Sequence, residues 1–154
     1  MAMKSIVVER RIQAPPGPVW EAITDLEGME RILSGVDRIE VLTEGAFGVG
    51  TRWRETRTMF GKQATEEMTV TEAEAPDRYV TVADSHGMHY VSEIALRPEG
   101  DGATVVRMTF QGGPAEGNRL GFLAKLLSGL GARAASRALA KDLDDVAASL
   151  ERRH

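Results

Sequence analysis

The chain has 154 residues, of which 42% are hydrophobic and 27% are charged, so we expect one globular domain over residues 1–154. Its 19 basic and 23 acidic residues give a formal net charge of -4, which argues against a nucleic-acid partner. The absence of cysteine excludes thiolate catalysis, cysteine zinc sites and disulfides. The N-terminus lacks an apolar signal segment and no stretch approaches about 20 continuous apolar residues, so we expect a soluble, cytoplasmic protein.

The first predicted elements are a strand and two short helices. Apolar residues alternate with charged ones over residues 5–13, which predicts a strand that ends at the Ala-Pro-Pro sequence of residues 14–16. Apolar residues then recur every three to four positions, which predicts a helix over residues 19–26. Gly28 limits this helix, and a second short helix is expected over residues 29–33.

The rest of the chain predicts a meander of strands followed by one long helix. Residues 38–111 contain turn sequences at short spacing, which indicates six consecutive antiparallel strands. Residues 118–150 have a helical period and are rich in alanine and leucine. The fold class is therefore α+β: a seven-stranded antiparallel sheet covered by the long C-terminal helix, with two short helices after the first strand. The glycine-rich residues 45–50 join two strands and open no helix, so we expect a tight turn rather than a phosphate loop.

Several short segments of this chain are similar to one superfamily. They are Ile12-Gln13-Ala14-Pro15, Val19-Trp20 with Asp25, the residues 48–53 (GVGTRW), Pro76, and residues 101–104 (DGAT). Together with the element order they resemble the START-like superfamily, also called SRPBCC or the polyketide cyclase/dehydrase group. The resemblance departs at Met29 and Ile32, where many relatives carry a tryptophan pair. It implies a helix-grip fold with a deep apolar cavity between sheet and terminal helix, which holds a lipid-, polyketide-, hormone- or quinone-like molecule.

The turn at Phe60-Gly61 predicts which residues of two strands lie opposite each other. Apolar residues of both strands share the phase that contains Trp53, so this phase is expected to face the core. The same phase contains three ionisable residues. The expected cross-strand pairs are Trp53 with Met68, Glu55 with Glu66, Arg57 with Ala64, and Met59 with Lys62.

Glu55, Glu66 and Arg57 are the candidate catalytic residues. Charged groups on a core face destabilise a fold unless they are paired, hydrated or functional, because desolvation of an unpaired charge costs several kcal/mol. In a hydrated cavity, either glutamate would be a general base and Arg57 would stabilise an oxyanion. The alternative is a solvated surface cluster at a twisted end of the sheet, and the residues alone leave both interpretations open.

Other positions of the same strands supply the candidate ligand-binding residues. The turn at His86-Gly87 places Tyr90 and Ser92 inward, and it places His89 outside, opposite Asp84. We therefore expect a surface pair at His89 rather than a metal ligand, and we expect no metal and no cofactor. The candidate ligand-binding residues are Trp53, Met59, Met68, Tyr90, Ser92, Met108 and Phe110 from the sheet, and Leu123, Leu127 and Leu130 from the terminal helix.

Two classes of function fit these residues. The first is a binder of a small hydrophobic ligand, whose enzymatic form would be a polyketide cyclase or dehydrase. The second is a membrane-peripheral lipid or quinone carrier, because residues 118–141 contain five basic residues and no acidic one beside many leucines. A core-covering helix explains the same leucines and is favoured over a membrane-binding helix. The sequence leaves open the ligand, the presence of catalysis and the oligomeric state.

Overall fold

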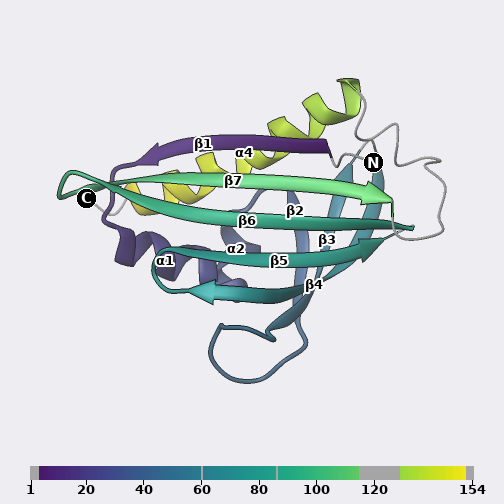
Figure 1. Cartoon of the computed structure of the whole chain (residues 1–154), viewed down its shortest axis with the longest axis horizontal. Coiled ribbons are helices and arrows are strands. Elements are labelled where there is room, and N and C mark those ends of the chain that lie inside the picture. Colours follow the sequence, from purple (N-terminus) through teal and green to yellow (C-terminus); the bar gives the residue numbers. More distant parts are fainter. Residues whose placement is uncertain (1–3, 60, 86, 115–128, 152–154) are drawn as a thin grey trace.

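A computed structural model describes residues 4–59, 61–85, 87–114 and 129–151 of the chain. A seven-stranded antiparallel sheet curls around the C-terminal helix (Figure 1), in the spatial order β1-β7-β6-β5-β4-β3-β2. The elements are β1 (Lys4–Ile12), α1 (Pro16–Thr24), α2 (Leu26–Ile32), β2 (Val36–Val41), β3 (Arg52–Met59), β4 (Lys62–Glu74), β5 (Arg78–Ser85), β6 (Met88–Glu99), β7 (Ala103–Pro114) and α4 (Gly129–Glu151). The predicted α+β architecture is confirmed, while the first part of the predicted terminal helix lies outside the described residues.

The two short helices begin a few residues earlier than predicted. Proline is tolerated in a first helical turn, so α1 already begins at Pro16. The side chain of Asp25 accepts a hydrogen bond from the backbone nitrogen of Gly28 at 3.1 Å, and this N-cap starts α2 at Leu26. A side chain at position 28 would not fit, because a Cβ there would lie 2.3 Å from the Asp25 carboxylate.

Both predicted hairpin registers are confirmed. In the β3–β4 hairpin all four expected pairs are present, including Glu55 opposite Glu66. In the β5–β6 hairpin Asp84 lies opposite His89, and His89 Nδ1 lies 2.8 Å from Asp84 Oδ1. The registers fix which side chains face α4.

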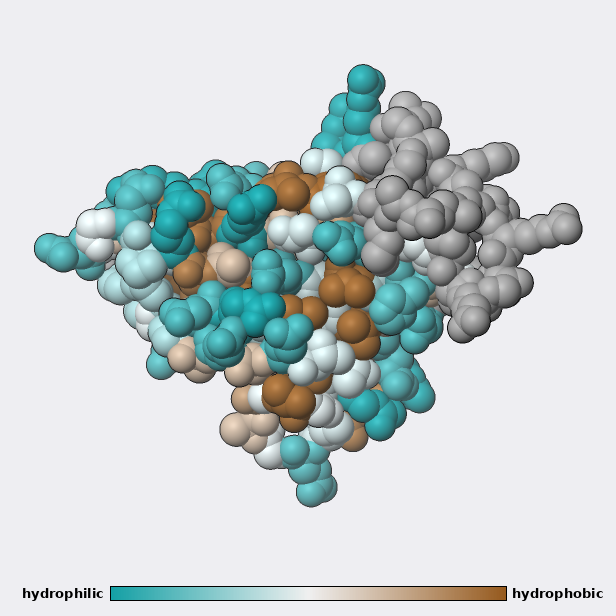
Figure 2. All heavy atoms as spheres, in the orientation of Figure 1, coloured by the Kyte–Doolittle hydropathy of each residue, from teal (hydrophilic) through white to brown (hydrophobic). Residues whose placement is uncertain are grey.

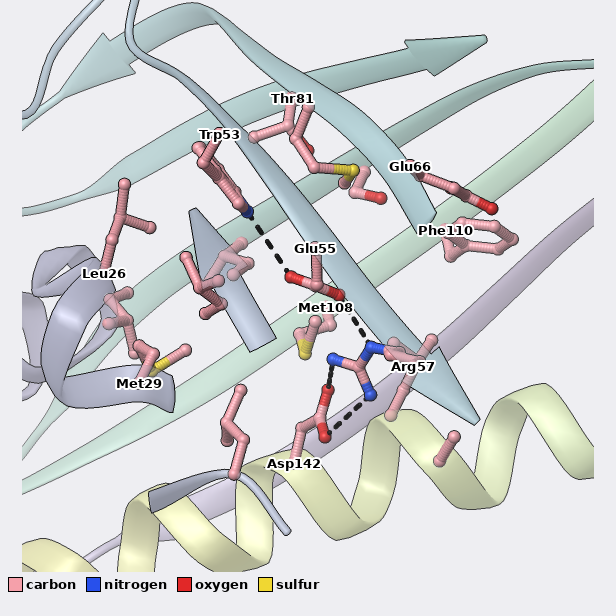
Figure 3. A pocket seen from close by; sticks show the side chains of 18 of the residues that line it. Leu26, Met29, Trp53, Glu55, Arg57, Glu66, Thr81, Met108, Phe110 and Asp142 are labelled. Carbon is pink, nitrogen blue, oxygen red and sulfur yellow. Dashed lines mark hydrogen bonds and ion pairs between the residues drawn. The ribbon is translucent and has the colours of Figure 1, made fainter. Parts of the chain in front are cut away.

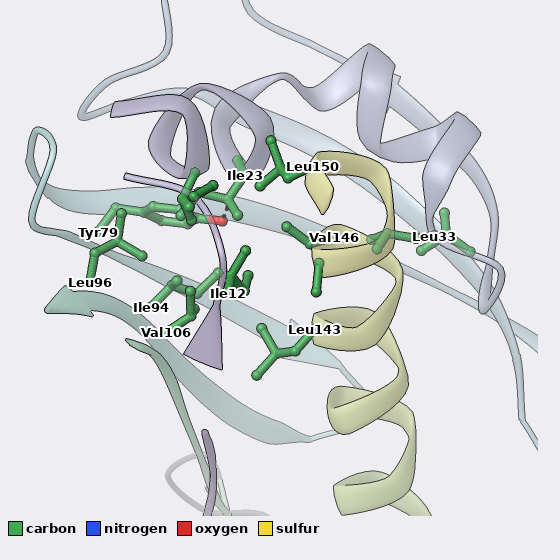
Figure 4. Close-up of a cluster of buried hydrophobic side chains, with 14 residues drawn as sticks. Ile12, Ile23, Leu33, Tyr79, Ile94, Leu96, Val106, Leu143, Val146 and Leu150 are labelled. Carbon is green, nitrogen blue, oxygen red and sulfur yellow. Dashed lines mark hydrogen bonds between the residues drawn. The ribbon is translucent and has the colours of Figure 1, made fainter. Parts of the chain in front are cut away.

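The hydrophobic core lies between the concave face of the sheet and one face of α4 (Figure 4). Leu143, Val146 and Leu150 are buried on this helix at a spacing of three to four residues. They pack in one cluster with Ile12 of β1 and Ile23 of α1. Other members of the cluster are Ala14, Val19, Leu33, Val36, Tyr79, Ile94, Leu96, Val106 and Ala147.

The glycine-rich segment between β2 and β3 is not the tight turn that its composition predicted. Ten residues, 42–51, separate the two strands, and Gly45 and Gly50 have φ angles of 93° and 94° that favour glycine. The loop folds back far enough to place Phe47 on the core. Its ring lies 4.9 Å from the ring of Tyr79 and 6.4 Å from that of Trp53. The loop therefore contributes an aromatic contact to one end of the core.

The outer face of the sheet is mixed in character. Figure 2 shows hydrophobic residues interspersed with hydrophilic ones over the strands. Arg78 forms ion pairs there with Glu72, Glu74 and Glu93 at 3.1, 2.6 and 2.8 Å. Among the described helices, none has the length and apolar character needed to cross a bilayer.

Candidate functional site

A pocket of about 230 Å³ lies between the concave face of the sheet and α4 (Figure 3). It is larger than an apolar cavity of about 150 Å³ that holds benzene, so it has room for a small ring-containing molecule. Most of its lining is apolar. The apolar lining residues are Ile23, Leu26, Met29, Leu33, Ile39, Trp53, Ala64, Met68, Ile94, Met108, Phe110, Ala135, Ala138, Leu139, Leu143 and Val146. Tyr79 also lines the pocket, and the remaining polar groups are Glu55, Arg57, Glu66, Thr81, Ser92 and Asp142.

A network of charged side chains joins the sheet to the helix at this pocket. Arg57 Nε donates to Glu55 Oε2 at 2.6 Å. The two terminal nitrogens of Arg57 donate to the two carboxylate oxygens of Asp142 at 3.2 and 2.6 Å. Trp53 Nε1 donates to the other oxygen of Glu55 at 3.4 Å. Figure 3 shows this chain of contacts from β3 across to α4.

Simple periodicity places these groups in the pocket. Trp53, Glu55 and Arg57 are alternate residues of β3, so their side chains share the concave face. Asp142 lies on the face of α4 that packs on the sheet, one residue before buried Leu143. The network is therefore built into the two elements and does not depend on a loop.

Burial and charge act in opposite directions on the protonation of this network. Burial lowers the pKa of Arg57, but the carboxylates of Glu55 and Asp142 outweigh it and raise that pKa above its ordinary value. Burial raises the pKa of Asp142 above its ordinary value, although the hydrogen bonds from Arg57 oppose the rise. Arg57 is thus firmly cationic, and Asp142 takes a proton more readily than an exposed aspartate.

Two tyrosines near the carboxylates are also affected. Burial, and then the charge of Glu55, raises the pKa of Tyr79 above its ordinary value. Burial, and then the charge of Glu66, raises the pKa of Tyr90 to about 12. Both phenols therefore stay protonated in the neutral range.

The structure brings most of the candidate residues of the sheet together. Glu55, Glu66 and Arg57 all lie in the lining of the pocket, and so do Trp53, Met68, Ser92, Met108 and Phe110. Tyr90 is not among the lining residues. Its ring stacks on Phe110 at 5.3 Å in a neighbouring cluster with Met88 and Ala83.

The remaining candidates fall on parts of the chain that are not described. The side chain of Met59, at the end of β3, and that of Leu130, in the first turn of α4, lie outside the described residues. Leu123 and Leu127 also lie outside them. Within the described part of α4, Arg133 and Arg137 are exposed, and Lys141 forms an ion pair with Asp145.

Sequence reasoning missed Asp142 and Thr81. Asp142 falls within the apolar stripe of the terminal helix, three residues after Leu139 and four before Val146. This spacing could have indicated that its carboxylate faces the sheet. Thr81 lies opposite Ser92 in the β5–β6 hairpin. The valines on either side of Thr81 obscured which face of β5 was buried.

Comparisons with known proteins agree with this architecture. The family described as "Polyketide cyclase / dehydrase and lipid transport" matches residues 3–152. No protein of curated function matches the chain.

Solved structures with the same fold include an aromatase/cyclase, Zhui from Streptomyces sp. R1128 (18% identity, 99% of this chain and 96% of that chain, TM-score 0.82). They also include norcoclaurine synthase from Thalictrum flavum (15% identity, 99% of this chain and 89% of that chain, TM-score 0.75). A third is a START superfamily protein from Mycobacterium smegmatis (14% identity, 96% of this chain and 99% of that chain, TM-score 0.73). The expected START-like fold is confirmed, and the chain belongs to the polyketide cyclase/dehydrase and lipid transport family.

Proposed function

We propose that this protein binds a small, mostly apolar ligand in the pocket between the sheet and α4. The observation that carries the proposal is the pocket itself, whose walls are aliphatic, aromatic and thioether side chains with a few polar groups. Sulfur-containing side chains from three elements, Met29, Met68 and Met108, suit a wall that adapts to its ligand. The norcoclaurine synthase of similar fold was solved in complex with dopamine and hydroxybenzaldehyde, and both of these compounds contain a single six-membered aromatic ring.

The charges around the pocket favour a neutral ligand over an anionic one. Three carboxylates and one guanidinium line it. The guanidinium of Arg57 is already bonded to Glu55 and Asp142. A carboxylate ligand at Arg57 would therefore have to compete with Glu55 and Asp142 for the same guanidinium in a partly desolvated space.

Naphthalene is a direct probe of this binding. Equilibrium dialysis with absorbance detection should find saturable, one-to-one binding to the wild-type protein. Ala138→Phe projects a ring from α4 into the pocket and should abolish binding, whereas Ala140→Phe, at an exposed position of the same helix, should not. Binding that is unsaturable, or that survives Ala138→Phe in a folded protein, would reject the proposal.

The charged network supports a catalytic version of the same proposal, a cyclase or dehydrase. Such chemistry removes a proton beside a carbonyl, and Glu55 or Glu66, which both line the pocket, would accept that proton. Arg57 has five N–H donors, of which three are used in hydrogen bonds to Glu55 and Asp142. The other two have no acceptor among the described residues and would serve the developing enolate oxygen. Asp142 acts through Arg57 by holding its guanidinium in place.

Deuterium exchange at C1 of 2-tetralone in D2O isolates this proton transfer. The protein should accelerate the exchange seen by NMR, and Glu55→Gln or Glu66→Gln should remove most of the acceleration while naphthalene still binds. If the wild-type protein does not accelerate the exchange of 2-tetralone, it is a binder only. If both variants accelerate the exchange as the wild type does, neither glutamate is the base.

The carrier alternative depends on the basic stretch of residues 118–141, of which residues 118–128 lie outside the described part of the chain. Co-sedimentation with anionic vesicles distinguishes the two functions. We expect the protein to stay in the supernatant; sedimentation that salt reverses would instead favour a membrane-peripheral carrier.

A further inference from the structure

Two hydroxyl side chains stand side by side on the sheet wall of the pocket. Thr81 of β5 and Ser92 of β6 are direct cross-strand partners, and both line the pocket. Directly opposed residues of antiparallel strands have β-carbons about 4.5 to 5.5 Å apart. One ligand atom can therefore contact both hydroxyls.

Neither hydroxyl has a hydrogen-bond partner among the described residues. Thr81 is only 3% exposed, so this is an unusual position for an unpaired hydroxyl. In the part of the chain that the structure describes, Arg10 Nε is the one fully enclosed side-chain polar atom that lacks a partner. The oxygens of Thr81 and Ser92 are therefore not sealed in the core but open to the cavity.

The surroundings of the pair are apolar. Along the sheet, Val70 lies next to Thr81 and Phe110 lies next to Ser92. Ile94, two residues from Ser92, faces the same pocket. The direct cross-strand neighbours of the two hydroxyls are thus apolar, whereas the carboxylates and the guanidinium of the pocket lie on β3, β4 and α4.

We propose that Thr81 and Ser92 form a hydrogen-bonding subsite for a neutral oxygen of the ligand, a ring hydroxyl or a ring carbonyl. This inference rests on the proposed binding function and narrows its ligand class. A hydroxyl both donates and accepts, so the pair fits either kind of oxygen. A plain hydrocarbon chain would leave both hydroxyls unsatisfied, and this subsite therefore selects against it.

The matched probes 2-naphthol and naphthalene test the subsite, because they differ by one hydroxyl. The wild-type protein should bind 2-naphthol about fivefold to tenfold more tightly in equilibrium dialysis, as one buried hydrogen bond predicts. Thr81→Val with Ser92→Ala should remove that preference, because 2-naphthol loses its hydrogen-bond partners while naphthalene has none to lose. Thr109→Val, the same change on the opposite face of the neighbouring strand β7, should keep it.

Thermal unfolding adds a readout that separates a ligand subsite from a structural role. Thr81→Val conserves the shape and removes an unpaired hydroxyl, so its Tm should stay the same or rise. A lower Tm would show that the hydroxyl serves the fold and would overturn the proposal. An equal preference for 2-naphthol in the double variant and the wild type would also overturn it, while the binding function would stand. If the wild-type protein binds neither probe, both the subsite and the binding function are rejected.

Discussion

Two arginines of this sheet each gather carboxylates, but they do so in different surroundings. Arg57 faces the pocket and binds Glu55 and Asp142, whose side chains are 19% and 6% exposed. Arg78 faces outward and binds three glutamates, whose side chains are between 38% and 64% exposed. In both clusters the carboxylates raise the pKa of the arginine above its ordinary value, against the opposing effect of desolvation.

The comparison shows that water, rather than the number of partners, distinguishes the clusters. Exposed ion pairs contribute about 0 to 1 kcal/mol, because water and salt screen them. A buried pair contributes little net stability, yet loss of one partner costs about 3 to 5 kcal/mol because the other charge stays buried. Removing one partner of the Arg57 cluster should therefore destabilise the fold more than removing Arg78. The Arg57 cluster is also the one that lines the pocket, where a ligand can contact it.

The largest difference should appear on replacing each arginine with methionine. Arg57→Met leaves the carboxylates of Glu55 and Asp142 close together without a cation, and we expect a loss of about 3 kcal/mol in unfolding free energy at pH 7. Arg78→Met should cost less than about 1 kcal/mol. Urea denaturation measures both values, and equal losses would contradict the distinction.

A smaller effect should appear in the pH dependence of stability. The folded pKa of Asp142 is raised above 3.8, so its ionised form costs stability once the pH rises through that folded pKa. Asp142→Asn should therefore gain stability relative to the wild type as the pH rises above about 4.

Asp145, three residues along the same helix, is the matched control with the opposite sign. Hydrogen bonds from Lys141 and Ser34, together with the charge of Lys141, outweigh burial and lower the pKa of Asp145 below 3.8. The ionised Asp145 therefore stabilises the fold above pH 3.8, and this stabilisation is lost as the pH falls through the folded pKa. Asp145→Asn should lose stability relative to the wild type as the pH rises. Urea denaturation between pH 3 and pH 7 measures the unfolding free energy of both variants against pH. If the two variants change in parallel with pH, the opposite pKa shifts of Asp142 and Asp145 are contradicted.

The smallest effect concerns a glycine beside the network. A Cβ at Gly35 would lie 3.2 Å from Arg57 Nη1, and three hydrogen bonds prevent the guanidinium from moving away. Gly35→Ala should therefore lower the unfolding free energy by about 1 kcal/mol. Gly17→Ala in α1, where a Cβ meets nothing within 4 Å, should leave it unchanged or raise it. Similar results for the two variants would argue that the guanidinium is loosely held.

These clusters also mark what the sequence could predict. Alternation along β3 and the turn at Phe60-Gly61 predicted that Glu55, Glu66 and Arg57 share the phase of Trp53, because strand periodicity and turn length are local properties. They left open whether these three side chains meet a cavity or bulk solvent. The contact between Arg57 and Asp142 was not predictable in this way, since it depends on how α4 lies across the sheet. The position of Phe47 was not predictable either, because its loop has no period that fixes a buried face.

The central claim is that a ligand enters the pocket between the sheet and α4, and the two tryptophans test it directly. Trp53 lines the pocket, whereas Trp20 is not a lining residue and packs its ring on Tyr79 at 5.9 Å. A titration with 2-methyl-1,4-naphthoquinone, a quencher, should give strong, saturable loss of emission in Trp20→Phe, which keeps Trp53. The loss should be much weaker in Trp53→Phe. A response that resides wholly in Trp20, or that never saturates, would contradict the account.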